Sequence, residues 1–143
     1  MEKKEQRRMI RSMRPSLRRR LAGRFVSWLA GRRFDRAADQ AELLHGLHRS
    51  YQYFVVEDGG GKAKPGTLVI MSERAWREYT HSRQRKELGR MKRGCWYKTE
   101  GKQGVPGLTP RERELRRLMY IKTMLEAQGY LDPPGMKDEG GTE

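Results

Sequence analysis

The sequence has few of the residues that form disulfides and metal sites. Its 143 residues include a single cysteine, Cys95, so no disulfide can form within the chain. The three histidines, His45, His48 and His81, would form a metal site with that cysteine only if the fold brought them together. We therefore predict no metal site.

Long apolar runs are also absent. No stretch approaches the roughly 18 apolar residues that a transmembrane helix needs. The segment Phe25–Ala30 is too short for a secretory signal, and arginines flank it on both sides. The glycines at 59–61 precede Lys62, but the Ser or Thr of a nucleotide-binding loop does not follow. We therefore predict an intracellular protein, cytoplasmic or nuclear, without a transmembrane segment and without a cofactor.

Acidic residues are scarce relative to basic ones. The chain has 18 Asp and Glu against 32 Lys and Arg, a net charge of +14. Arginines outnumber lysines by 22 to 10, which favours bidentate phosphate contacts and stacking over simple point-charge attraction. Apolar and charged residues each make up 35%, which indicates one domain with a small core. These values favour a polyanionic partner such as nucleic acid, or an anionic membrane surface.

The positive charge is concentrated near the start of the chain. Residues 1–36 contain thirteen Lys or Arg and three acids, a net charge of 13 − 3 = +10. Apolar residues recur on one side of a predicted helix over residues 15–31, with Gly31 as its stop. That apolar stripe consists of Leu17, Leu21, Phe25, Trp28 and Leu29. We expect most of the stripe to dock on the domain core, so that the helix is fixed and its arginines face solvent.

The rest of the pattern predicts a small α+β domain over residues 15–131, with a basic, mobile N-terminal arm (1–14) and a disordered acidic tail (132–143). A second helix beginning at Asp35 would form an antiparallel pair with the first. A β-hairpin, a helix, a third short strand and a last helix would then follow. The expected ranges are strands at 51–56 and 67–71, a helix at 73–93, a strand at 95–99, and a helix capped by Thr109 and ended at Gly129.

Two groups of basic residues are predicted to hold phosphates. The first lies on the N-terminal helix: Arg18, Arg19, Arg20, Arg24, Arg32 and Arg33. The second lies on the helix at 73–93: Arg83, Arg85, Lys86, Arg90, Lys92 and Arg93. Lys62 and Lys64 at the hairpin tip are further candidate phosphate contacts. We expect the two helices to share one positive surface that neutralises several phosphates at once.

These observations predict a non-enzymatic nucleic-acid-binding protein, a viral or phage regulator or a ribonucleoprotein component. RNA is slightly favoured over DNA, because arginine-rich helices fit widened RNA grooves and aromatic side chains stack on unpaired bases. The candidate stacking residues are Tyr51, Tyr53, Trp96 and Tyr97. Sequence specificity and oligomeric state stay open.

Two alternatives also stay open. In the first, the amphipathic helix at 15–33 serves as an adaptor that binds a protein partner or an anionic membrane, of which the membrane is the less favoured. In the second, Glu57, Asp58 and Glu100 hold a metal ion in a nuclease. A basic neighbourhood would also lower the pKa of Cys95, although a packed strand residue is the more usual role, and no catalytic residue is assigned.

Overall fold

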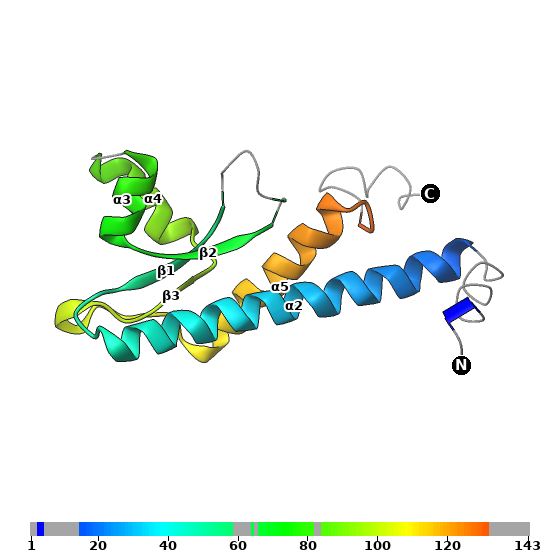
Figure 1. Cartoon of the computed structure of the whole chain (residues 1–143), viewed down its shortest axis with the longest axis horizontal. Coiled ribbons are helices and arrows are strands. Elements are labelled where there is room, and N and C mark those ends of the chain that lie inside the picture. Colours follow the sequence, from blue (N-terminus) through cyan, green and yellow to red (C-terminus); the bar gives the residue numbers. More distant parts are fainter. Residues whose placement is uncertain (1–2, 5–14, 59–63, 65, 82–83, 132–143) are drawn as a thin grey trace, which may run out of the picture.

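A three-stranded antiparallel sheet lies between two layers of helices (Figure 1). The computed structural model describes residues 3–4, 15–58, 64, 66–81 and 84–131. The elements are α2 (Pro15–Leu47), β1 (Tyr53–Glu57), β2 (Leu68–Ser72), α3 (Glu73–Thr80), α4 (Arg85–Gly94), β3 (Tyr97–Lys98), a 3₁₀ turn (Lys102–Gly104) and α5 (Pro110–Ala127). The strand order is β2-β1-β3, and the predicted α+β class is confirmed.

The central strand β1 supplies side chains to both helical layers. Phe54 lies in a core with α4, and Val56 packs against that core. Val55 lies in the opposite core with α2 and α5, and Tyr53 packs against it. Successive side chains of a strand point to opposite faces of the sheet. A strand with apolar side chains on both faces is therefore stable only when other elements pack on both faces. Helices therefore cover both faces of the hairpin, α4 on one side and α2 with α5 on the other.

The predicted N-terminal helix pair is wrong, because α2 is one helix of 33 residues. Gly31 does not end it: the residue is buried, and a Cβ there would lie 2.5 Å from Nη2 of Arg117 and 3.5 Å from Cδ1 of Ile121. Asp35 does not cap a new helix but accepts a hydrogen bond from Nε of Arg117 at 3.1 Å. Both residues thus serve the packing of α5 on α2.

The partner of α2 is therefore α5, which runs antiparallel to it. Asp39 meets Arg113 at one end of the contact, and Gly23 lies beside Tyr130 beyond the other. The core between these helices and the sheet is built on α2 mainly from small residues, which allow a close approach. Its buried members on the two helices are Ala30, Phe34, Ala37, Ala38, Ala41, Tyr120 and Met124.

The predicted helix at 73–93 is two helices. Ser72 caps α3 as expected, because its hydroxyl accepts a hydrogen bond from the N–H of Ala75 at 3.2 Å. His81 then adopts a left-handed conformation, with φ of 54°, that a helix cannot continue through. A new helix, α4, begins at Arg85.

The predicted ends of the last helix are confirmed. The N–H of Glu112 donates to Oγ1 of Thr109, and the N–H of Thr109 donates to Oε1 of Glu112, both at 3.2 Å. The hydrogen bond from the N–H of Thr109 to the Glu112 carboxyl, with a smaller effect of the Thr109 side chain, lowers the pKa of this exposed carboxyl. At the other end Gly129 has a φ of 79°, and the N–H of Tyr130 donates to the carbonyl of Leu125.

Gly66, before β2, gives a test of this packing. Its φ is 84°, its carbonyl accepts a hydrogen bond from the Tyr120 hydroxyl, and a Cβ would overlap Sδ of Met124. Gly66→Ala should lower the free energy of unfolding by about 2 kcal/mol or more, measured by urea denaturation. Gly46→Ala, in α2 with no atom near its Cβ, should instead be neutral or stabilise by up to about 1 kcal/mol. Equal effects at the two positions would contradict this packing.

Candidate nucleic-acid interface

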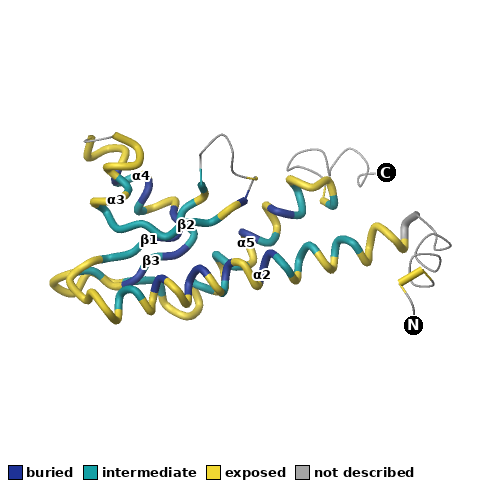
Figure 2. Tube along the Cα trace, in the orientation of Figure 1, coloured by how far each residue is buried: buried dark blue, intermediate teal, exposed yellow. Residues whose placement is uncertain are grey.

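The N-terminal half of α2 extends beyond the sheet. None of its described residues from Leu17 to Leu29 is buried, whereas buried residues recur from Ala30 onward (Figures 1 and 2). We call residues 15–29 the projecting half of α2. At 1.5 Å per residue it is about 22 Å long.

The arginines of the predicted first group are exposed along this helix. Arg18, Arg19, Arg20 and Arg24 lie on the projecting half, and Arg32 and Arg33 follow it. None of the six forms an ion pair with a described residue. The ion pairs among the described residues all join an acid to an arginine or lysine of α3, α4 or α5. This surface therefore carries uncompensated positive charge within the described parts of the chain.

The expected docking of the apolar stripe is wrong. Leu17, Leu21, Phe25 and Trp28 keep 44%, 43%, 59% and 54% of their surface exposed. The reason is helical phase: Phe25 and the buried Phe34 are nine residues apart, which is two and a half turns, so they lie on opposite sides of α2. The face that binds the core is set by Phe34 and the alanines, and the stripe points elsewhere.

The exposed aromatic residues of the stripe lie among the arginines. The ring centroids of Phe25 and Trp28 are 6.1 Å apart. The guanidinium of Arg32 lies over the Trp28 ring, 5.1 Å from its centroid, a cation–π geometry. Two large rings and a planar cation thus share one exposed part of α2.

A groove separates the projecting half from the end of α5. Its walls are formed by Leu17, Leu21 and Trp28 on one side and by Tyr130 and Leu131 on the other. Nη2 of Arg19 donates a hydrogen bond to the carbonyl of Gly129 at 2.6 Å. Although its apolar stripe is uncovered, the projecting half is therefore held in place by the segment after α5.

The hairpin brings one predicted lysine to α2. Lys64 lines a cleft with Arg33 and Arg36, between α2 and β2. Burial raises the pKa of the Tyr120 hydroxyl, and the neighbouring Arg33 partly offsets that rise. Sequence reasoning missed Arg36, although it follows Arg32 and Arg33 by one helical turn and is exposed. Lys62 lies outside the described residues.

The second predicted basic group does not join this surface. Helix α4 packs on the opposite face of the sheet from α2, so the expected shared positive surface is wrong (Figure 1). Lys86, Arg90 and Arg93 are exposed at i, i+4 and i+7, on the side of α4 away from its buried Leu88. They form a separate cationic stripe.

The other members of the second group differ from one another. Arg85 is exposed at the start of α4. Nζ of Lys92 lies 3.5 Å from Glu73 and 6.0 Å from the ring centroid of Phe54, so its charge is partly compensated. Arg83 lies outside the described residues.

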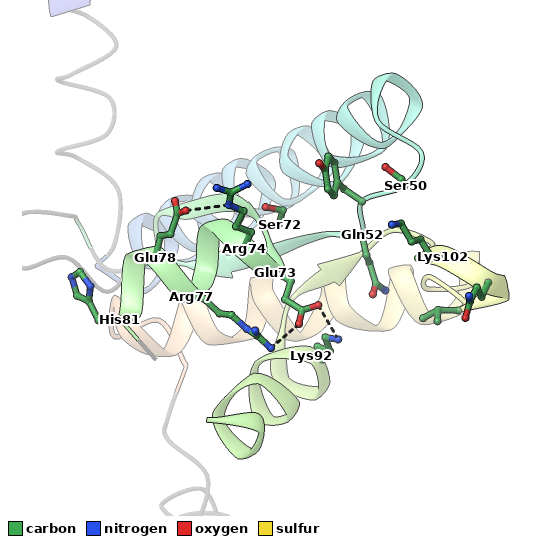
Figure 3. Close-up of a pocket in the computed structure, with 14 residues that line it drawn as sticks. Ser50, Gln52, Ser72, Glu73, Arg74, Arg77, Glu78, His81, Lys92 and Lys102 are labelled. Atoms are coloured by element: carbon green, nitrogen blue, oxygen red, sulfur yellow. Dashed lines mark hydrogen bonds and ion pairs between the residues drawn. The ribbon is translucent and has the colours of Figure 1, made fainter. Parts of the chain in front are cut away.

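A wide trough borders α3, the start of β1 and the 3₁₀ turn. Figure 3 shows Glu73 between Arg77 and Lys92. Oε1 of Glu73 lies 3.0 Å from Nη2 of Arg77, and its Oε2 lies 3.5 Å from Nζ of Lys92. Arg74 pairs with Glu78 along the same helix. Most of the charges in this trough thus pair with one another, which distinguishes it from the projecting half of α2.

Most of the aromatic residues predicted to stack on bases are structural. Tyr97 is 5% exposed, and its hydroxyl donates a hydrogen bond to Oε1 of Glu42 at 2.7 Å. Burial, together with Glu42, raises the pKa of Tyr97. Trp96 packs edge-on against Tyr120, and Tyr53 packs against the same core. Of the four residues only Tyr51 is exposed.

The carboxylates considered for a nuclease do not converge. Glu57 accepts a hydrogen bond from the N–H of Gly66, and Asp58 accepts one from the Tyr79 hydroxyl. Glu100 follows Thr99, which bonds to Tyr53 at the other end of β1. Tyr53 is four residues from Glu57, which is about 13 Å at 3.3–3.4 Å per residue. Within the described ranges no three His, Cys, Asp or Glu residues come close enough to hold a metal ion.

The chemistry considered for Cys95 also changes. Burial raises the pKa of this thiol, and Lys98 and Arg116 lower it by less. Cys95 is buried in the core under α4, and this burial outweighs its basic neighbours, so the expected net lowering of its pKa is wrong.

Comparison with known proteins adds no identification. The chain matches no protein-family model, no curated protein and no solved structure. In the parts of the chain that the structure describes, no helix has the length and apolar character needed to cross a bilayer. The exposed cationic surface of α2 is therefore the main indication of function.

The raised pKa of Cys95 can be tested with a thiol reagent. At pH 8 the native chain should react with Ellman's reagent more slowly than the urea-unfolded chain, because burial of the thiol raises its pKa and lowers the thiolate fraction. A native rate equal to or above the unfolded rate would show an activated, accessible thiol.

Proposed function

We propose that this protein binds nucleic acid, RNA in preference to DNA, through the projecting half of α2 and the arginines that follow it, without catalysing a reaction. The observation that supports this most strongly is the set of six exposed arginines with no ion pair to a described residue, interleaved with exposed aromatic rings. Lys64 and Arg36 extend the same cationic side of the molecule toward the hairpin.

The arginines would supply most of the affinity. A guanidinium can hold a phosphate through two parallel hydrogen bonds, and each neutralised phosphate releases counterions. The helix is narrow enough to enter a groove about 12 Å wide, such as a widened RNA groove or the major groove of DNA. Because residues 128–131 hold the helix in place, it loses less conformational entropy when it binds.

The aromatic residues favour a ligand with unpaired bases. Phe25 and Trp28 are the most exposed members of the apolar stripe, and Arg32 already stacks on Trp28. Stacking of a base on such a ring contributes about 1–3 kcal/mol and does not depend strongly on sequence. The separate stripe at Lys86, Arg90 and Arg93 would contact a second part of a large ligand.

A second candidate function is an adaptor that inserts the stripe into an anionic membrane or a partner's groove. The exposure of Leu17, Leu21, Phe25 and Trp28 favours it, since burial of these side chains would stabilise such a complex. The two functions differ in which residues control binding and in the ligand that is bound.

The salt dependence of binding tests the proposal. Fluorescence anisotropy gives the binding constant for a bulged RNA hairpin at several salt concentrations. The slope of log binding constant against log salt concentration should become shallower by about 1.4–1.8 in Arg20→Ala/Arg24→Ala, because each lost phosphate contact removes about 0.7–0.9 from it. The matched control, Arg49→Ala/Arg74→Ala, removes two exposed arginines elsewhere and should leave the slope unchanged.

The same measurement is made with duplex DNA and with vesicles containing anionic lipid. Weaker binding to DNA is the expected result. Vesicle binding that is lost in Trp28→Glu, with no retention of either nucleic acid at low salt, would overturn the proposal in favour of the adaptor.

A further inference from the structure

Helix α5 presents an apolar face that no described residue covers. Leu115, Leu118 and Met119 are 55%, 51% and 52% exposed. Their spacing of three and four residues places them on one side of the helix, away from the buried Tyr120 and Met124. An exposed cluster of three large apolar side chains on one helix is typical of an interaction surface.

The charges that border this face are of both signs. Arg111, Glu112 and Glu114 precede the apolar cluster, and Lys122 and Glu126 follow it. These five residues sum to 2 − 3 = −1, while the whole chain carries +14. A nearly neutral face with charges of both signs can meet another copy without the repulsion that the rest of the surface would produce.

We propose that this face binds a second copy of the chain, with the two α5 helices antiparallel about a two-fold axis at Leu118. In an antiparallel pair, residues equally far from the axis on either side meet. Glu114 is four residues before Leu118 and Lys122 four after it, so Glu114 meets Lys122 of the second copy. Arg111 is seven residues before Leu118 and so faces Leu125 of the second copy, with Glu126 one residue further along and within reach of the arginine side chain.

The order of charges is therefore self-complementary, as a two-fold interface requires. A parallel pair would instead place Arg111 against Arg111 and Glu114 against Glu114.

This inference is independent of nucleic-acid binding, because α5 carries none of the proposed phosphate contacts. One helix from each copy makes an interface at the small end of the range for specific association. The dimer should therefore form in a concentration-dependent way.

Sedimentation equilibrium of the nuclease-treated, nucleic-acid-free chain tests the proposal. The apparent mass should rise with concentration from 16.8 kDa toward twice that value. Leu118→Glu should weaken dimerisation by at least about tenfold, because the residue meets itself at the axis and the two carboxylates repel. Leu47→Glu, which alters a leucine 70% exposed on α2, is the matched control and should dimerise normally.

The charge pairing is tested in the same experiment. Glu114→Lys and Lys122→Glu should each weaken the dimer, and the double variant should restore it, with circular dichroism confirming that each variant is folded. A wild-type chain that stays monomeric up to about 1 mM, a concentration above that of most weak complexes, overturns the proposal. So does a dimer insensitive to Leu118→Glu, or a double variant that fails to restore association. Monomers that float with anionic vesicles through this face would assign it to lipid instead.

Discussion

The close approach of α2 and α5 at Gly31 is the constraint on which the rest of the structure depends. Because Gly31 has no side chain, Arg117 can cross α2 there and reach Asp35. The ion pair itself is partly exposed, and such pairs contribute about 0–1 kcal/mol. The ion pair matters because it fixes the position of α5 beside the alanines of α2. In that position the buried Tyr120 reaches the carbonyl of Gly66 at the hairpin.

That constraint also divides α2 into two functional parts. From Ala30 to Ala41 the helix provides small side chains to a core that includes the sheet. Before Ala30 the helix extends past the sheet (Figure 1), and it lines a groove with Leu125 of α5 and with Tyr130 and Leu131 beyond that helix. The projecting half therefore keeps its leucines, aromatic rings and arginines exposed, although it belongs to the same continuous helix. Function is proposed for the part of the helix that the core does not use.

The sequence predicted those elements whose signals are local. The capping box at Thr109 and Glu112, the serine cap of α3 and the hairpin strands depend on neighbouring residues, and all were found. Gly31 was misread because a glycine that ends a helix and a glycine that admits a neighbouring helix look alike in sequence. The left-handed His81 was not predicted: histidine adopts that conformation more often than most residues, but too rarely for one histidine to mark the end of a helix.

The candidate site was predicted in its residue types but not in its arrangement. Exposed arginines follow from composition, but which side of α2 faces the core depends on Phe34 and its partners in α5 and the sheet. The stripe at Leu17 and Phe25 has the same period as a buried face, so sequence alone could not show that it is uncovered. Likewise, nothing local indicated that α4 packs across the sheet from α2.

The most direct test of the central claim is fluorine NMR of the chain labelled with 5-fluorotryptophan, titrated with a bulged RNA hairpin. Trp28 lies on the projecting half, Trp76 on α3 and Trp96 against the core, so the three resonances report three parts of the molecule. The account predicts that the Trp28 resonance shifts and saturates while those of Trp76 and Trp96 stay in place. A shift confined to Trp76, or saturable binding that leaves Trp28 unchanged, would contradict it.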